Sequence, residues 1–184
     1  SHLQKCIRRG FIYKALLTAF LLLENSPTNF LRRLPIIILE DVYTIENFDI
    51  IIWFMVMSPY ITLPESFKQW ILYIVVFITQ HPSKHHYDHN RIPSYNKLST
   101  LPISIKSIVY SLMIRKSYGG LKNDMIMIDS IINFWITSYI NDNTILLPKI
   151  KPKNIIIYKL MGHELYEKSG VDFHCFPKII DIIH

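Results

Sequence analysis

Residues 3–42 constrain the fold most, because strong charges recur at fixed positions inside long apolar runs. Three pairs of like charges interrupt this segment: Arg8 and Arg9, Arg32 and Arg33, and Glu40 and Asp41. The second and third pairs stand seven or eight residues apart. That separation is close to two helical periods, so a helix carries both pairs on one face.

The same spacing predicts how these charges are used. Two turns separate the arginines from the acids, which argues against a direct bond within the helix. We expect each pair to bridge to a neighbouring helix, with Arg8 and Arg9 as natural counterparts of Glu40 and Asp41. Such bridges fix helix register more than they add stability. A solvated charged face is the alternative.

The spacing of apolar residues, with glycines and prolines between the apolar runs, predicts an all-α chain of about seven to nine helices. We expect these helices at residues 3–9, 11–24, 27–41, 48–57, 65–80, 101–116, 123–140 and 162–168, and from residue 177 onward. A short strand pair near residues 154–175 is the one expected exception.

Single residues set several expected boundaries. Gly10 suits a left-handed helix stop, and Pro27 suits a first helical position, where its missing N–H is tolerated. Pro35 should kink or split its helix. Thr100 is placed to cap the helix that follows it. The three tryptophans lie in long apolar runs and are expected in the core: Trp53, Trp70 and Trp135.

The length of 184 residues suggests one domain in total, and half of the residues are apolar, which is enough for a sizeable core. The best candidate for an internal boundary is a polar loop at residues 81–100. We therefore expect a first region at 1–84 and a second, helical region at 85–184 that packs on the first. The chain begins without Met and stops inside a helix-like segment, which suggests a domain cut from a larger protein.

The net charge limits the possible partners of the chain, and the cysteine content indicates its compartment. The net charge of +6 permits DNA, RNA or an anionic membrane surface as a partner, although lysines that keep an apolar protein soluble explain it equally. Two distant cysteines predict a reducing, intracellular compartment. The uncharged stretches are too short to span a bilayer. Abundant Ile, Asn and Lys indicate an AT-rich genome.

Several short motifs then carry a family resemblance. They are KCIR at 5–8, AL at 15–16, LLE at 22–24, RRL at 32–34, EDV at 40–42, LPE at 63–65 and HPSK at 81–84. This pattern, over roughly residues 3–84, resembles the C-terminal region of MgsA/RarA-type AAA+ ATPases, which are relatives of the clamp loaders. The resemblance implies an all-helical collar that drives oligomerisation in DNA replication or repair, without catalytic residues.

The chain also departs from that family. It contains no G-x-x-x-x-G-K-S/T sequence, so it does not bind ATP as a P-loop protein does. Residues 90–184 do not match the later segments of the family.

A glycine-containing turn at residues 117–124 is the best candidate anion site. Gly119 and Gly120 precede a predicted helix N-terminus, and Arg115, Lys116 and Lys122 stand nearby. Backbone N–H groups at a helix N-terminus bind phosphate readily. A helix C-cap explains the two glycines equally well. Together with Arg8 and Arg9, these cations are our candidates for nucleic-acid contact.

A histidine-rich loop is a weaker candidate, for a metal site. His85 and His89 share one face if the loop is helical, and His81 stands close by in sequence. Such a set suits zinc, but prolines around it favour an exposed loop and no matching Cys or His pair follows. We therefore expect no cofactor and keep zinc as the alternative.

A second compact cluster lies near the C-terminus. Asp172 and His174 share one face of an extended segment, where the acid would orient the imidazole as a base, and Cys175 offers a nucleophile. A buried turn before a helix at Pro177 explains the same residues.

Three hypotheses remain. The first is a non-catalytic helical assembly domain that resembles an AAA+ collar, forms homo-oligomers and contacts nucleic acid. The second is a small metal- or His-dependent enzyme acting on a phosphorylated or nucleic-acid substrate. The third is an interaction domain of a larger protein.

Overall fold

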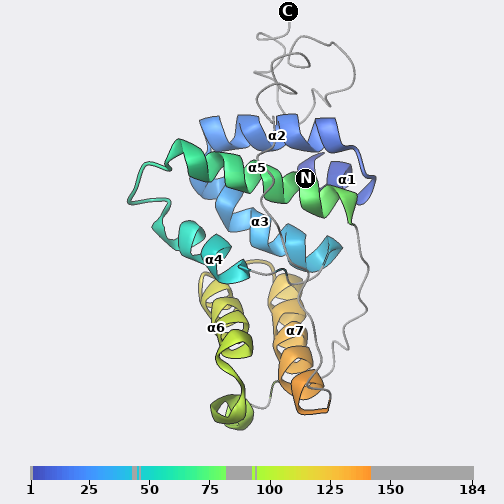
Figure 1. Cartoon of the computed structure of the whole chain (residues 1–184), viewed down its shortest axis with the longest axis vertical. Helices are drawn as coiled ribbons and strands as arrows, with labels where there is room; N and C mark the ends of the chain where they lie inside the picture. The colour runs from blue at the N-terminus through green and yellow to red at the C-terminus, as the bar shows by residue number, and fades with distance from the viewer. Residues whose placement is uncertain (1, 43–44, 46, 82–92, 94, 142–184) are drawn as a thin grey trace, which may run out of the picture. The chain divides into compact units, whose positions relative to one another are not determined.

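The computed structural model describes residues 2–42, 45, 47–81, 93 and 95–141, the last four of them by backbone alone. These residues form seven α-helices and one 3-10 helix and contain no strand, which confirms the predicted all-α class. The elements are α1 (His2–Arg8), α2 (Ile12–Asn25), α3 (Pro27–Asp41), α4 (Phe48–Met57), α5 (Glu65–Gln80), η1 (Tyr95–Thr100), α6 (Ile103–Ser117) and α7 (Lys122–Asn141) (Figure 1). The predicted strand pair near 154–175 and the helices expected beyond it lie outside the described residues.

The chain divides into two compact units, each built from separate stretches of sequence. The described part of the first unit is residues 2–30 and 58–81. The described part of the second unit falls within residues 31–57 and 93–141. The units therefore interleave along the chain, with their boundary inside α3, whereas the sequence suggested two consecutive regions at 1–84 and 85–184.

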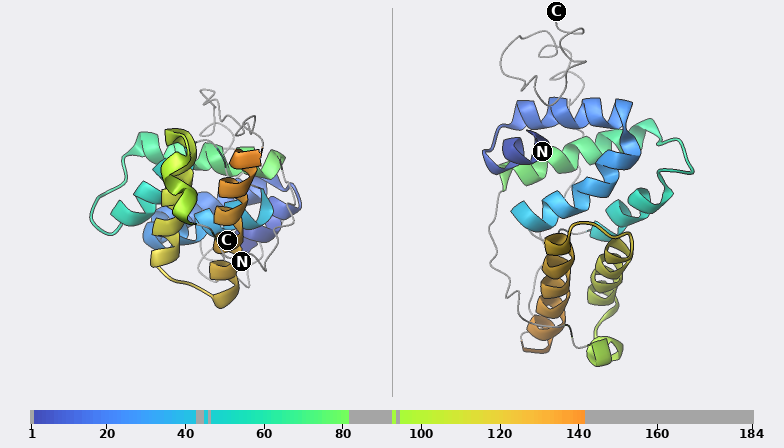
Figure 2. Two further views of the ribbon diagram at one scale, coloured as in Figure 1. Left: turned by 90° about the horizontal axis from the view of Figure 1, so that it is seen from below. Right: turned by 180° about the vertical axis from the view of Figure 1, so that it is seen from behind.

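In the first unit, α1, α2 and α5 pack against one another in all three pairings (Figures 1 and 2). Gly10 joins α1 to α2 in a left-handed conformation, with φ of +70°. The N–H groups of Phe11 and Gly10 donate to the carbonyls of Cys6 and Ile7, which is the Schellman arrangement. The predicted helix stop at Gly10 is thus confirmed.

In the second unit, α6 packs against both α7 and α4. The core side of α7 consists of fully buried side chains at helical spacing: Ile128, Ile131, Ile132, Trp135 and Ile136. The prediction of a buried Trp135 is confirmed. Trp53, however, is 50% exposed on α4, so its predicted burial is wrong. Apart from Asp49 in its first turn, helix α4 is apolar on every side, and its sequence therefore indicates poorly which face is buried.

Two predicted boundaries need correction. Helix α3 begins at Pro27, as expected, but continues through Pro35 as one helix and is not split there. Thr100 does not cap α6, because Pro102 occupies the N-cap position and the Thr100 hydroxyl donates instead to the carbonyl of Lys97. Among the described residues, no helix is both long and apolar enough to cross a membrane.

A charge network at the α6–α7 turn

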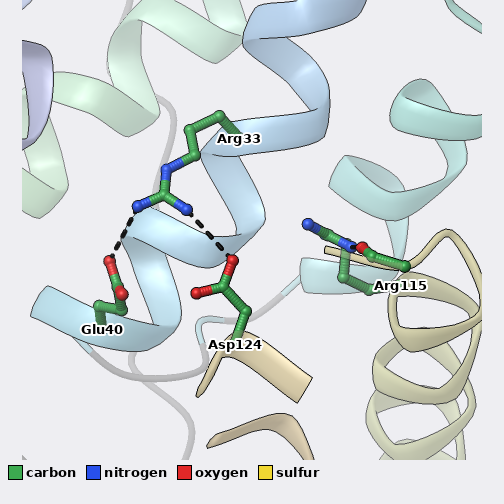
Figure 3. A network of polar contacts seen from close by, with 5 residues as sticks. Arg33, Glu40, Arg115 and Asp124 are labelled. Carbon is green, nitrogen blue, oxygen red and sulfur yellow. Dashed lines mark hydrogen bonds and ion pairs between the residues drawn. The ribbon is translucent and has the colours of Figure 1, made fainter. Parts of the chain in front are cut away.

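Arg33 of α3 contacts two carboxylates in the second unit (Figure 3). Its Nη1 lies 3.3 Å from Asp124 Oδ2 at the start of α7, and its Nη2 lies 3.4 Å from Glu40 Oε2 on α3 itself. The Asp124 side chain is only 8% exposed. Arg33 therefore ties α3 to α7 through a carboxylate that is almost completely removed from water.

The pair within α3 corrects one sequence argument. The spacing of seven residues was taken to be too long for a direct bond, yet Arg33 and Glu40 meet. Seven residues rise about 10 Å along a helix. The extended side chains of arginine and glutamate span that distance when they lie along one face.

Two further arginines bind the turn between α6 and α7. Arg115 is buried, and its Nη1 donates to the carbonyl of Gly119 at 2.7 Å. Arg32 Nη2 donates to the carbonyl of Tyr118 at 3.3 Å. Both carbonyls lie just past the C-terminus of α6, where the helix dipole is negative and unpaired carbonyls attract cations. The two guanidinium groups thus hold the backbone of the turn that follows α6.

The backbone of the turn approaches the network closely at its second glycine. Gly119 and Gly120 have φ of +71° and +155°, values that L side chains rarely adopt. A Cβ placed on Gly120 would lie 3.2 Å from Met125 Cε, 3.6 Å from Asp124 Oδ2 and 3.7 Å from Arg115 Nη2. A Cβ on Gly119 would meet nothing within 4 Å. Glycine at 120 therefore fits the backbone of the turn and avoids a close contact with the end of the Met125 side chain.

Burial and like charges act together on Arg115. Burial lowers the pKa of its guanidinium, the charges of Arg32 and Arg33 lower it further, and Asp124 opposes both effects. Asp124 is thus the carboxylate that acts on both Arg33 and Arg115. Asp124 also lies in the first turn of α7, where a negative charge is favourable. Its carboxylate is the central anion of the network.

A second pair connects α6 and α7 further along. Lys116 Nζ lies 2.6 and 2.8 Å from the two oxygens of Asp129. The Tyr95 hydroxyl of η1 donates to Asp129 Oδ1 at 3.5 Å. Burial and the negative charge of Asp129 raise the pKa of Tyr95, and the hydrogen bond adds to this, whereas Lys116 opposes it.

The predicted anion-binding residues occupy different surroundings. Arg115 and Lys116 already make internal contacts, with Gly119 and Asp129 respectively. Lys122 is exposed at the first position of α7. Arg8 and Arg9 are exposed at the end of α1, in the first unit. The structure therefore does not gather the five residues into one site within either unit.

The other candidate sites are described only in part. His81 is exposed at the end of α5, with its Nδ1 2.9 Å from the carbonyl of Phe77 and its ring stacked on the Phe77 ring. The remaining candidates lie outside the described residues: His85, His89, Asp172, His174 and Cys175. In the part of the chain that is described, no group of three or more His, Cys, Asp or Glu side chains is placed to hold a metal.

Sequence reasoning missed the role of Asp124. It was expected only to open a helix, because its partner Arg33 lies 91 residues away. One feature of the sequence could have indicated this role. Asp124 lies in the first turn of a predicted helix, just after a turn that contains two glycines and has cations on both sides. A buried contact in α1 was also missed, since Cys6 Sγ lies 3.3 Å from His2 Nε2 one turn away.

The described part of the chain is all-α, and the pairs Arg33–Asp124 and Lys116–Asp129 join its helices. Compared with models of protein families, with curated proteins and with solved structures, the chain shows no match.

Proposed function

We propose that this chain is a non-catalytic helical assembly domain that forms homo-oligomers. The observation that carries this proposal is the exposure of large apolar side chains on both units. Among them, Ile103 is 87% exposed, Tyr60 79%, Leu121 70% and Trp53 50%. Scattered apolar residues are normal on a surface, but gathered ones indicate protein contacts.

The use of the strongest cations supports the same proposal. Arg33 pairs with Asp124, Arg115 Nη1 donates to the carbonyl of Gly119, and Lys116 pairs with Asp129, so each of these cations makes a contact within the chain. A rigid helical frame with an exposed apolar surface suits assembly, because little conformational entropy is lost when such a surface binds.

The resemblance to the collar of MgsA/RarA-type ATPases adds a context. Its RRL and EDV motifs lie at 32–34 and 40–42, in and just after α3, where Leu34 and Val42 are buried and Arg33 joins Glu40. Replication or repair as the setting, and nucleic-acid contact through exposed Arg8, Arg9 and Lys122, are part of the proposal. The net charge of +6 favours such contact.

Two measurements on the full chain test the proposal. Sedimentation equilibrium from about 1 to 100 μM should give a mass above the monomer. Retention of single- and double-stranded DNA should fall steeply as salt rises, because phosphate contacts release counterions. A monomer at every concentration would refute the assembly function, and the absence of salt-dependent retention would refute the nucleic-acid contact.

A further inference from the structure

An apolar stripe runs along the exposed side of α6. Ile103, Tyr110 and Ile114 are 87%, 49% and 44% exposed. At 100° per residue, their positions fall within about 40° of one another around the helix axis. Ser107 lies at the edge of this arc, about 40° from Ile103. The stripe therefore extends from the first residue of α6 to its last turn and carries no charged side chain.

The exposed face of α4 continues this stripe. Ile50 and Trp53 are 37% and 50% exposed, and they lie one turn apart on α4, which packs against α6 (Figure 1). Asp49 Oδ2 accepts a hydrogen bond of 3.0 Å from the Ser107 hydroxyl, in the middle of the α6 stripe. This bond places the two exposed faces edge to edge. We call the combined area the α4–α6 surface: Ile50, Trp53, Ile103, Ser107, Tyr110 and Ile114.

We infer that the α4–α6 surface binds the same surface of a second copy of this chain, an inference that rests on the proposed assembly function. A twofold interface brings one patch against itself, so the patch must be complementary to itself. When two α6 helices cross antiparallel about the middle of the stripe, Ile103 faces Ile114 of the partner copy. Tyr110 then faces Ser107, a large side chain opposite a small one.

The exposed area is adequate for such a dimer. The five apolar side chains of the surface expose on the order of 500 Å², most of the roughly 800 Å² that each partner buries in a stable interface. Backbone and neighbouring side chains supply the rest. Trp53 and Tyr110 lie near the centre of the surface. Tryptophan and tyrosine are among the residue types that contribute most binding energy in interfaces.

Charge distinguishes this partner from others. None of the six residues of the surface is charged. Asp49 and Lys106 lie beside it, but Asp49 accepts a hydrogen bond from Ser107 and Lys106 donates to the carbonyl of Ser99, so nothing on the surface selects a charged partner. Two copies of a chain with net charge +6 repel each other. Salt screens that repulsion, so dimerisation through this surface should strengthen as salt rises, opposite to nucleic-acid binding.

The test compares the full wild-type chain with two matched variants by sedimentation equilibrium. Tyr110→Glu places a charge at the centre of the surface and should weaken dimerisation at least about tenfold. Tyr13→Glu is the control, because Tyr13 is 54% exposed on α2 in the first unit and should leave dimerisation unchanged. Circular dichroism should show all three chains folded. Raising NaCl from about 0.05 to 0.5 M should tighten the wild-type dimer.

The outcomes separate the inference from the proposed function. A wild-type oligomer that Tyr110→Glu and Tyr13→Glu leave equally intact would overturn the α4–α6 assignment while the assembly function stands. An oligomer that dissociates as salt rises would also overturn the assignment, because it would depend on charge. A wild-type monomer at all concentrations would overturn both the assembly function and the α4–α6 assignment. The surface would then be one that binds a different protein.

Discussion

Removing the negative charge of Asp124 should destabilise the fold well beyond an ordinary surface substitution. Asp124→Asn keeps the size of the side chain but removes the negative charge that pairs with Arg33 and acts on Arg115. Loss of one partner from a buried ion pair costs about 3–5 kcal/mol. Because the Arg33 side chain is 36% exposed, water screens its charge, and we reduce this figure to about 2 kcal/mol. Loss of a negative charge in the first turn of α7 adds about 0.5 kcal/mol.

Urea denaturation followed by circular dichroism measures this loss. With a slope of about 2 kcal/mol per M, a decrease of about 2.5 kcal/mol lowers the urea midpoint by roughly 1 M. Tryptophan fluorescence should follow the same transition, because two of the three tryptophans, Trp53 and Trp135, lie in the unit that contains the network. In wild-type protein the two signals give the reference midpoint.

Glu24→Gln is the matched control. Glu24 pairs with Lys68 in the first unit, but its side chain is 43% exposed, so its loss should cost less than about 1 kcal/mol. In a double-mutant cycle, Arg33→Met and Asp124→Asn together should cost about 1 kcal/mol less than the sum of the single changes. If Asp124→Asn costs no more than Glu24→Gln, or if the cycle shows no coupling, the argument that burial strengthens this pair is refuted.

Two other predictions concern the turn and the neighbouring tyrosine. Gly119→Ala should cost about 1 kcal/mol, because an L residue is strained at this φ. Gly120→Ala should lower stability more, because its φ is also unfavourable and its Cβ would lie 3.2 Å from Met125 Cε; equal urea midpoints would contradict this. The pKa of the Tyr95 hydroxyl is raised in the folded protein, so the unfolded chain loses the hydroxyl proton at a lower pH than the folded one. The stabilisation is therefore fully present below about pH 10 and is lost as pH rises through the pKa of the folded protein. Tyr95→Phe should reduce that alkaline loss in urea midpoints measured between about pH 9 and 11, and an unchanged loss would count against the shift.

Local sequence signals predicted helix ends well. Helices α4 and α5 span residues 48–57 and 65–80, as expected. Gly10 and Pro27 act at the positions where their backbone preferences place them. These features depend on a few adjacent residues, because glycine tolerates positive φ and proline tolerates a first helical position.

Contacts between residues far apart in the chain could not be predicted from the sequence. The partner of Arg33 on α7 became known only when the fold brought Asp124 beside it. The side of α4 that carries Trp53 was equally hidden, since periodicity selects a buried face only where polar residues mark the other one. Thr100 was wrongly expected to cap α6, because the helix begins at Ile103, two residues later than a cap at Thr100 requires.

The interleaved units have a consequence for the order in which the nascent chain folds. Residues 31–57 leave the ribosome before residues 93–141, with which they form the second unit. At about 5–20 residues per second, synthesis from residue 57 to residue 141 takes about 4–17 s. During that time the apolar side chains that α3 and α4 bury in the finished fold have no completed unit to enter. We therefore expect this stretch to be the main binding site for chaperones while the chain is being made.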